Sequence, residues 1–382
     1  MKKKKKVLKR GFTPEKKIKG ELYTHWEEIE QEIDAYLEHN PDLFKDKTVL
    51  LPCDDPLWSN FTKYFALRFE YLGLKKLIST SYAPKSGCGK DFYYLPPEIY
   101  ENENFDKEKD FERGRLFVLE NDNKTKDGVI NIADMEWEYL EGDGDFRSEE
   151  VTKLRDEADF IFVFPAFYFF RDFLHWTMAS KAQFSIISGI LAIAHTGIFS
   201  YITEKKMWPG KGFNKMAKFS IPEGSPVEST SNMKGEKDFL GREVVKMSNI
   251  CWYTNIPHGY KNEPMALMTK EENLRYNSRI YNNKNSYRNY DNYKAIEVPV
   301  VSGIPSDYTG VMGVPVSFLD KYCPEQFEII GIDLDVQDGR LDELIVEGWD
   351  KQLHKAYIDN RALFSRLLIK HKNPESLDKT SD

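Results

Sequence analysis

Cysteine is scarce in this chain, and its placement excludes two classes of protein. The four cysteines, Cys53, Cys88, Cys251 and Cys323, lie far apart among 382 residues. Such spacing fits neither a zinc site nor a small domain held by disulfides. Isolated thiols are typical of proteins kept in a reducing compartment. We therefore expect a cytoplasmic protein without a metal site.

A long uninterrupted hydrophobic run is also missing. The N-terminal lysines are not followed by the apolar segment of a signal peptide. Residues 182–203 contain no Asp, Glu, Lys or Arg and could span a bilayer by length, but serines, His195, Thr196 and two glycines interrupt them. The interruptions favour a buried strand, a turn and a helix over a membrane span.

Acidic residues are nearly absent from the N-terminus. Residues 1–20 hold ten Lys or Arg and a single acid, a local charge of +9, whereas the whole chain carries −8 and its remainder −17. A basic arm on an acidic body indicates an anionic partner, with nucleic acid first. A solvated flexible tail is the alternative.

The spacing of apolar residues predicts an α/β fold. Residues 47–56 indicate a strand that runs into a loop, residues 58–73 an amphipathic helix between Ser59 and Gly73, and residues 74–83 a second strand. A β-α-β unit of this kind predicts a parallel sheet.

Further elements are expected on both sides of this unit. We expect helices at 21–37, 173–180 and 197–206, a loop, helix and strand over 142–164, and a strand at 182–188. Residues 207–330 are rich in Tyr, Asn, Pro and Gly with short strands. The spacing of Ile358, Leu363 and Leu367 predicts an amphipathic helix in the tail.

No glycine-rich phosphate loop is present, but acidic residues follow two of the expected strands. One group is Cys53-Asp54-Asp55, and the other is the GDGD sequence that includes Asp143 and Asp145. Ligands of open α/β sheets bind at the carboxyl ends of strands. Carboxylates there suit a ligand with hydroxyls and amines, such as a nucleoside. The alternatives are helix capping for Asp54 and Asp55 and a tight turn for GDGD.

Long collinear stretches resemble the EcoRI-type adenine-specific DNA methyltransferases. They include "CDDPLWSNFTKYFALRFEYLGLKKLISTSY", "GDGDFRSEE", "DYTGVMGVPVSFLDKY" and "PEQFEIIGID", and the resemblance covers residues from about 20 to about 332. It implies a Rossmann-like sheet that binds S-adenosylmethionine, with an appended DNA-recognition region. It also implies a restriction-modification enzyme that flips adenine out of double-stranded DNA and methylates N6.

The resemblance also implies a division of the chain and the roles of individual residues. We expect a basic flexible arm at 1–20, a cofactor domain at 21–206, a target-recognition region with returning sheet elements at 207–332 and a helical tail at 333–382, in a monomer. The implied cofactor residues are Tyr23 and Thr24 near the methionine end, Cys53, Asp54 and Asp55 in the first strand loop, and Asp143, Asp145 and Phe146 around the cofactor adenine. Where the family has Phe-Tyr-Thr-Gln, this chain has Leu22-Tyr23-Thr24-His25.

The catalytic motif of the family is changed. Family members have Asn-Pro-Pro-Phe, whose Asn side chain and first Pro carbonyl accept the two hydrogens of the adenine amine while the Phe stacks on the base. This chain has Phe164, Pro165, Ala166 and Phe167 at those positions. The carbonyl and the stacking ring remain, but the side-chain acceptor is lost.

Three functions remain open at this point. The chain could be a weakened methyltransferase with another acceptor, such as His195 or Tyr168. It could be a silent relative that binds DNA or cofactor without methyl transfer. Its pocket could also take a different ligand, because residues 188–199 are mostly apolar where the family has polar side chains.

The later part of the chain, roughly residues 207–330, is expected to contact DNA, because cations there and just before it alternate with tyrosines. The alternative is a solvated face with buried tyrosines. The residues concerned are Lys205, Lys206, Lys211, Lys215, Lys218, Arg275, Arg279, Lys284 and Arg288, with Tyr276, Tyr281, Tyr287, Tyr290 and Tyr293.

Overall fold

The structure is a computed structural model. It describes residues 22–55, 59–83, 105–120, 137–194, 197–211, 213, 215–221, 233–238, 240–259, 263–349 and 355–375. The basic arm at 1–20, Cys88, His195 and Thr196 lie outside the described residues.

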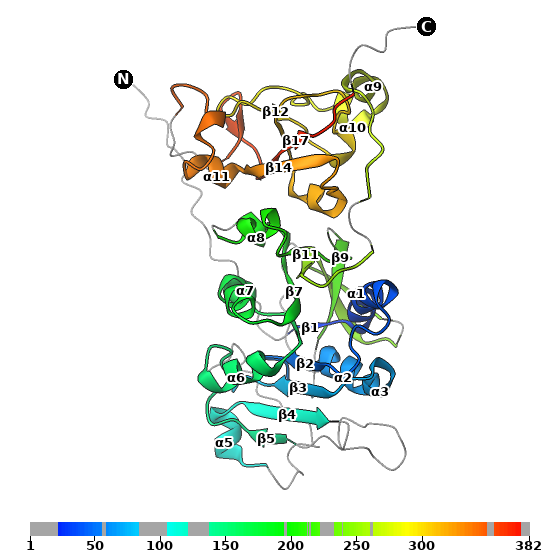
Figure 1. The fold of residues 1–382 in the computed structure, drawn as a ribbon, viewed down its shortest axis with the longest axis vertical. Coiled ribbons are helices and arrows are strands. Elements are labelled where there is room, and N and C mark those ends of the chain that lie inside the picture. Colours follow the sequence, from blue (N-terminus) through cyan, green and yellow to red (C-terminus); the bar gives the residue numbers. More distant parts are fainter. Residues whose placement is uncertain are drawn as a thin grey trace, which may run out of the picture.

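Four parallel strands form the centre of the main sheet (Figure 1). Their spatial order is β7 (Gln183–Gly189), β6 (Phe160–Val163), β2 (Thr48–Leu51) and β3 (Lys76–Thr80). All residues of β2 and β6 are buried, as expected for parallel strands that are covered on both faces. The predicted parallel β-α-β unit is confirmed.

Antiparallel strands extend this centre on both sides. Beyond β3 lie β4 (Arg115–Glu120) and β5 (Trp137–Tyr139). The strands beyond β7 belong to the N-terminus and to the region after residue 207. They are β11 (Glu243–Thr254), β9 (Lys215–Ser220) and β1 (Tyr23–Thr24), with β8 (Trp208–Pro209) and β10 (Met233–Lys237) also paired to β11.

Helices cover the two faces of the sheet, and successive residues of β2 serve different faces. Val49 and Leu51 pack with one group of helices, whereas Leu50 packs with the other. The first group is α1 (Trp26–His39), α2 (Asn60–Leu67) and α3 (Phe69–Leu72), and the second is α6 (Glu149–Glu157) and α7 (Phe170–Met178).

Two predicted helix limits are confirmed, and one helix begins later than expected. The Ser59 hydroxyl caps α2 by accepting from the Phe61 amide, and Gly73 ends α3 in the left-handed conformation. Helix α1 begins at residue 26 and not at 21, because Tyr23 and Thr24 pair with β9. A further short helix, α5 (Lys107–Glu112), precedes β4.

The candidate membrane segment folds as the predicted strand, turn and helix. Residues 182–203 form β7, the 3-10 helix η3 (Ile190–Ala194) and α8 (Phe199–Thr203). In the described ranges, no helix combines the length and the apolar character needed to cross a membrane.

A second sheet occupies the C-terminal part of the chain, and it contradicts the predicted helical tail. Strand β17 (Arg366–His371) pairs between β13 (Met312–Pro315) and β14 (Phe327–Ile332), and β12 (Ile296–Glu297) lies beyond β13. Ile358, Leu363 and Leu367 therefore do not share a helix.

The helical spacing in the tail was misleading because β17 is buried on both faces. Leu367 and Ile369 pack in the main core, whereas Leu368 packs in a separate cluster. A strand of this kind shows a continuous apolar run without alternation. Ile358 instead lies in β15 (Tyr357–Ile358), which pairs with β16 (Arg361–Ala362). The only α-helix in the described part of the tail is α11 (Asp333–Gln337).

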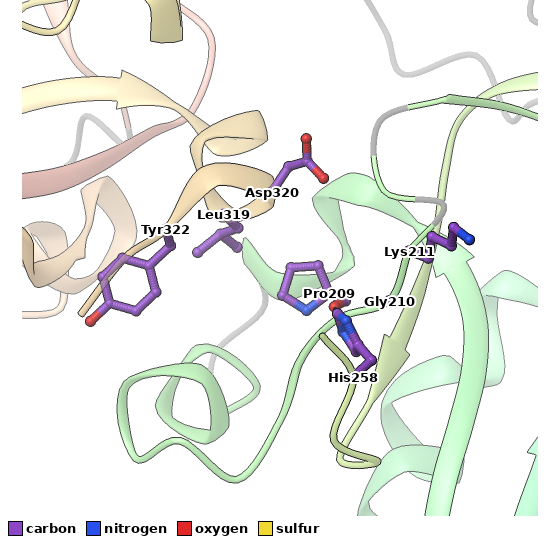
Figure 2. Close-up of a pocket in the computed structure, with 7 residues that line it drawn as sticks. All are labelled: Pro209, Gly210, Lys211, His258, Leu319, Asp320 and Tyr322. Carbon is purple, nitrogen blue, oxygen red and sulfur yellow. The ribbon is translucent and has the colours of Figure 1, made fainter. Parts of the chain in front are cut away.

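The second sheet is attached to the main sheet beside the end of β7. The 3-10 helix η5 (Val316–Lys321) contacts both β8 and η3, and α8 contacts β14. Pro209 of β8 faces Leu319 of η5 across a cavity of about 30 Å³, which Figure 2 shows together with His258 and Tyr322. The two sheets thus share one hydrophobic core.

A buried ion pair joins the first and last parts of the second sheet. Arg366 on β17 and Glu297 on β12 are 7% and 1% exposed, and the guanidinium binds both carboxylate oxygens at 2.7 and 3.0 Å. The Tyr290 hydroxyl donates to the same carboxylate at 2.5 Å. The pair therefore fixes β17 against residues some seventy positions earlier.

We expect Glu297→Gln to lower the free energy of unfolding by about 3–5 kcal/mol, because it leaves a buried guanidinium without its counter-charge. The matched control is Asp359→Asn, which weakens the exposed bidentate pair with Arg288 and should cost far less, because solvent screens that pair. Urea unfolding measures both. Equal losses for the two variants would contradict the role of burial.

Candidate active site

The order of the parallel strands creates a topological switch point at one edge of the main sheet. The chain moves outward from β2 to β3, and it returns to place β6 on the other side of β2. Connections therefore leave the carboxyl ends of β2 and β6 in opposite directions, and open α/β sheets bind ligands at such a point. The segments that emerge there are residues 52–55 and 164–167.

The loop after β2 is tied to the end of β3 and to the GDGD turn. Cys53 adopts a left-handed conformation with φ of 56°, and its amide donates to the Thr80 hydroxyl at 3.1 Å. The Cys53 thiol donates to the Gly144 carbonyl at 3.7 Å. Burial raises the pKa of Cys53 to about 12, so the thiol stays protonated and serves as a weak donor.

Asp54 is buried beneath this loop. Its amide donates to the Thr80 carbonyl at 2.6 Å, and its carboxyl accepts from the Thr62 hydroxyl at 3.2 Å. Burial raises the pKa of Asp54 to about 7, although hydrogen bonds from Ser59 and Thr62 oppose the shift. The capping alternative is wrong for the Asp54 and Asp55 side chains, because Ser59 caps α2.

Asp55 is held from the neighbouring strands. Arg115 on β4 donates to the Asp55 carboxylate at 3.0 Å, and the same guanidinium lies 3.5 Å from Asp110. Arg115 is buried, so this pair fixes the direction of Asp55 at the strand end. Sequence patterns did not identify Arg115, since a single Arg at the start of an apolar strand carries no spacing signal.

The GDGD sequence forms the tight turn and also lies beside the β2 loop. Gly144 has a φ of 82°, and a Cβ there would lie 2.1 Å from the Ser81 carbonyl oxygen. The Asp143 carboxylate accepts from the Asp145 amide at 3.1 Å. The GDGD sequence is therefore a tight turn, and this turn lies beside the loop that follows β2.

Phe146 and Arg147 follow the GDGD turn and have different surroundings. Arg147 binds the Asp145 carboxylate at 2.6 and 2.9 Å and is half exposed. Hydrogen bonds and charge from Arg147 hold the pKa of Asp145 below its usual value. Phe146 is buried, with its ring centroid 4.7 Å from that of Phe173 and 5.6 Å from that of Trp176. Phe146 thus supports the turn from within the core.

Strand β1 brings the N-terminal residues to the same region. The Asn60 side chain, at the start of α2, donates to the Thr24 carbonyl at 2.8 Å. Tyr23 pairs with Ser220 of β9, and the Thr24 hydroxyl is buried without a hydrogen-bond partner among the described residues. His25 caps α1, because its Nδ1 accepts from the Glu27 amide at 3.4 Å.

The segment after β6 presents aromatic rings. The Phe164 centroid lies 4.7 Å from that of Phe219 on β9 and 5.7 Å from that of Phe167. Pro165 is buried and Ala166 is exposed, while Phe167 is 41% exposed. Phe219 was not identified from the sequence, because its contact with Phe164 depends on the return of β9 to the sheet.

The neighbouring end of β7 is held by a buried tyrosine. The Tyr253 hydroxyl donates to the carbonyls of Gly189 and Ile190 at 3.1 and 3.0 Å. Leu191 follows them and is exposed. Of the two alternative acceptors, Tyr168 is exposed, and His195 lies outside the described residues.

The tyrosines predicted to contact DNA divide into two groups. Tyr287, Tyr290 and Tyr293 are buried, which agrees with the alternative of a structural role. Tyr276 and Tyr281 are exposed. Among the cations, Lys206, Lys218 and Arg288 are in ion pairs with Glu204, Glu27 and Asp359.

We expect Gly144→Ala to lower the free energy of unfolding by at least about 1–2 kcal/mol and to weaken ligand binding at this edge. The left-handed backbone and the nearby Ser81 carbonyl both oppose a Cβ. Gly142→Ala is the matched control, because a Cβ there meets nothing within 4 Å. Thermal unfolding of both variants tests the claim, and an unchanged Gly144→Ala protein would contradict it.

The raised pKa of Asp54 predicts how the free energy of unfolding changes with pH. Its folded pKa of about 7 lies above the unfolded value, so the folded chain keeps a proton that the unfolded chain has lost between about pH 4 and 7. Stability from Asp54 is therefore present at low pH and declines across this window. Asp54→Asn should remove the decline. Urea unfolding at several pH values measures it, and parallel profiles for both proteins would contradict the assignment.

The chain is similar to known proteins over nearly its whole length. The family described as adenine-specific methyltransferase EcoRI matches residues 12–372. The type II methyltransferase M.EcoRI of Escherichia coli is 32% identical over 353 residues, covering 92% of this chain and 93% of that protein. The type II methyltransferase M.MpnI of Mycoplasma pneumoniae is 30% identical, covering 84% of each. No solved structure matches the chain. The chain belongs to the EcoRI family of adenine-specific methyltransferases.

Proposed function

We propose that the chain binds S-adenosylmethionine and double-stranded DNA as a site-specific adenine N6-methyltransferase does, and that its methyl transfer is slow. The observation that carries the proposal is the convergence of three segments at one edge of a Rossmann-like sheet. The loop at 53–55, the GDGD turn and the segment at 164–167 meet where the strand order reverses. The family match supplies the reaction.

The polar groups at this edge suit a nucleoside cofactor with an amino acid portion. Asp54, Asp145 and the buried Thr24 hydroxyl offer acceptors for amine and hydroxyl donors. The Arg147 pair with Asp145 is half exposed and therefore weak, so a ligand can exchange with it. When bound, S-adenosylmethionine supplies an electrophilic methyl group. Phe146 serves this site by shaping the turn and not by stacking on the ligand.

The segment at 164–167 suits a flipped adenine only in part. Phe167 presents an exposed ring that can stack on a base, and Pro165 supplies a carbonyl. The adenine amine is a poor nucleophile because its lone pair is delocalised into the ring. Two acceptors for its hydrogens are needed to localise that pair, and Phe164 provides none. Loss of one preorganised partner costs about 100- to 1000-fold in rate.

The packing of Phe164 favours a second candidate function, which is binding without transfer. Its ring lies against Phe219 and Phe167, so an aromatic cluster occupies the position where the family has a carboxamide. Such a site keeps the means of stacking on a base and loses the means of activating it.

We expect Phe164→Asn with Ala166→Pro to raise methyl transfer by about 100-fold or more, because it restores an acceptor beside the target amine. The measurement is transfer of labelled methyl from S-adenosylmethionine to unmethylated genomic DNA, with the N6-methyladenine positions mapped. Phe164→Leu with Ala166→Pro is the matched control, since it changes the ring without adding an oxygen. It should remain slow.

Three results would count against the proposal. Fast transfer by the unmodified chain would show that another group grips the amine. Absence of heat on titration with millimolar S-adenosylmethionine would show that the chain does not bind this cofactor. If duplex binding does not weaken with added salt, the chain makes no phosphate contacts that stabilise the complex, because such contacts release counterions. No transfer by either variant, with both ligands bound, would leave the binding function alone.

A further inference from the structure

Two short helices in the C-terminal part carry an exposed surface that the fold does not require. We define the α9–α10 surface as α9 (Lys270–Tyr276), α10 (Ser278–Tyr281) and the turn to residue 284. Tyr276 is 68% exposed and Tyr281 is 57% exposed. Large aromatic side chains with this exposure cost free energy in water and commonly mark a place of contact.

The cations of this surface are available to an anion. Arg279 and Lys284 are exposed and are in no ion pair with a described residue. Arg275 lies 3.6 Å from Glu271, but both groups are mostly exposed, so that pair is weak. Its guanidinium also lies 5.8 Å from the centre of the Tyr276 ring.

The local charge is opposite in sign to that of the body. Residues 270–284 hold four cations and two acids, a charge of +2, whereas the chain beyond residue 20 sums to −17. A polyanion would therefore be repelled by much of this body and attracted here. Exposed tyrosines on the same two helices as cations outside ion pairs with described residues suit a nucleic acid, which offers phosphates to the cations and sugars or bases to the rings.

The helices hold this surface rigidly. Thr269 and Glu272 form a reciprocal capping box at the start of α9, and the Lys270 amide donates to Asp307 at 2.8 Å. The Asn277 side chain accepts from the Arg279 amide and donates to the Ser302 carbonyl at 3.0 Å. A rigid surface can bind without a large loss of conformational entropy.

The position of the surface agrees with the candidate active site. Helices α9 and α10 belong to the part of the chain that η5 attaches to η3, and η3 follows directly after β7. They lie at the outer end of that part in Figure 1. The surface and the carboxyl end of β7 thus belong to parts of the chain that are packed together.

We infer that the α9–α10 surface is a docking site for duplex DNA, with Arg279 and Lys284 on phosphates and Tyr276 and Tyr281 on the exposed sugar and base edges. The inference rests on the proposed function, since it assigns a surface to the DNA partner of the same site. It adds an anchor away from the reacting base, which would set the register of the duplex on the protein.

The test uses the full chain and a short fluorescent DNA duplex, with binding followed by anisotropy at several salt concentrations. Arg279→Gln with Lys284→Gln should weaken binding and lower the magnitude of the salt slope by about 2, since each lost phosphate contact removes roughly 0.9. Tyr276→Ala with Tyr281→Ala should weaken binding about tenfold or more and leave the slope unchanged.

The matched control is Tyr71→Ala with Lys75→Gln, an exposed aromatic and an exposed cation at the end of α3. It should bind DNA as the unmodified chain does. Calorimetry with S-adenosylmethionine should give one affinity for all variants, which shows that each is folded.

The outcomes separate the two claims. If the unmodified chain binds DNA and both α9–α10 variants bind equally well, the docking site is wrong and the proposed function stands. If the unmodified chain does not bind duplex DNA, both fail together. If the tyrosine variant changes only the mass in solution, the surface joins copies of this chain, and the inference is overturned.

Discussion

The parallel pairing of β2 with β3 on one side and with β6 on the other is the constraint on which the site depends. It brings the loop at 53–55 and the segment at 164–167 to one edge, although more than one hundred residues separate them. The remaining parts are attached to this edge by particular contacts. The Cys53 thiol reaches the GDGD turn, and Asn60 reaches β1. The segments proposed to bind the cofactor and the base become neighbours because β2 pairs on both sides.

The ring of Phe164 packs in an aromatic cluster at the position where the family motif has an asparagine. The ring of Phe164 packs on Phe219, which β9 brings back to the sheet from more than fifty residues away. A carboxamide at position 164 would place polar atoms against that apolar ring, and these atoms need partners when buried. The substitution therefore suits its surroundings, and an acceptor restored there must find its partner in the ligand.

The sequence predicted the parts of the fold that rest on local signals. Ser59 and Gly73 bounded their helices, and the apolar runs at β2, β3, β6 and β7 gave the parallel centre. The tail failed because a strand buried on both faces shows no alternation, and its apolar residues matched a helical period by chance. Site residues that act across the sheet, such as Arg115 and Phe219, could not be found. Their partners are decided by strand order, which a single sequence does not display.

Charge supports the proposal that one surface of this acidic protein binds a polyanion. The body beyond the arm repels phosphate at long range, so approach is favourable only where cations outnumber acids. The α9–α10 surface meets that condition, whereas two other cations predicted to bind DNA, Lys206 and Lys218, are in ion pairs with Glu204 and Glu27. An ion-paired cation keeps its carboxylate beside it, so the pair adds no net positive charge that would attract a phosphate. The proposed docking of a duplex on the α9–α10 surface therefore rests on cations that share two helices with exposed rings and lie outside ion pairs with described residues.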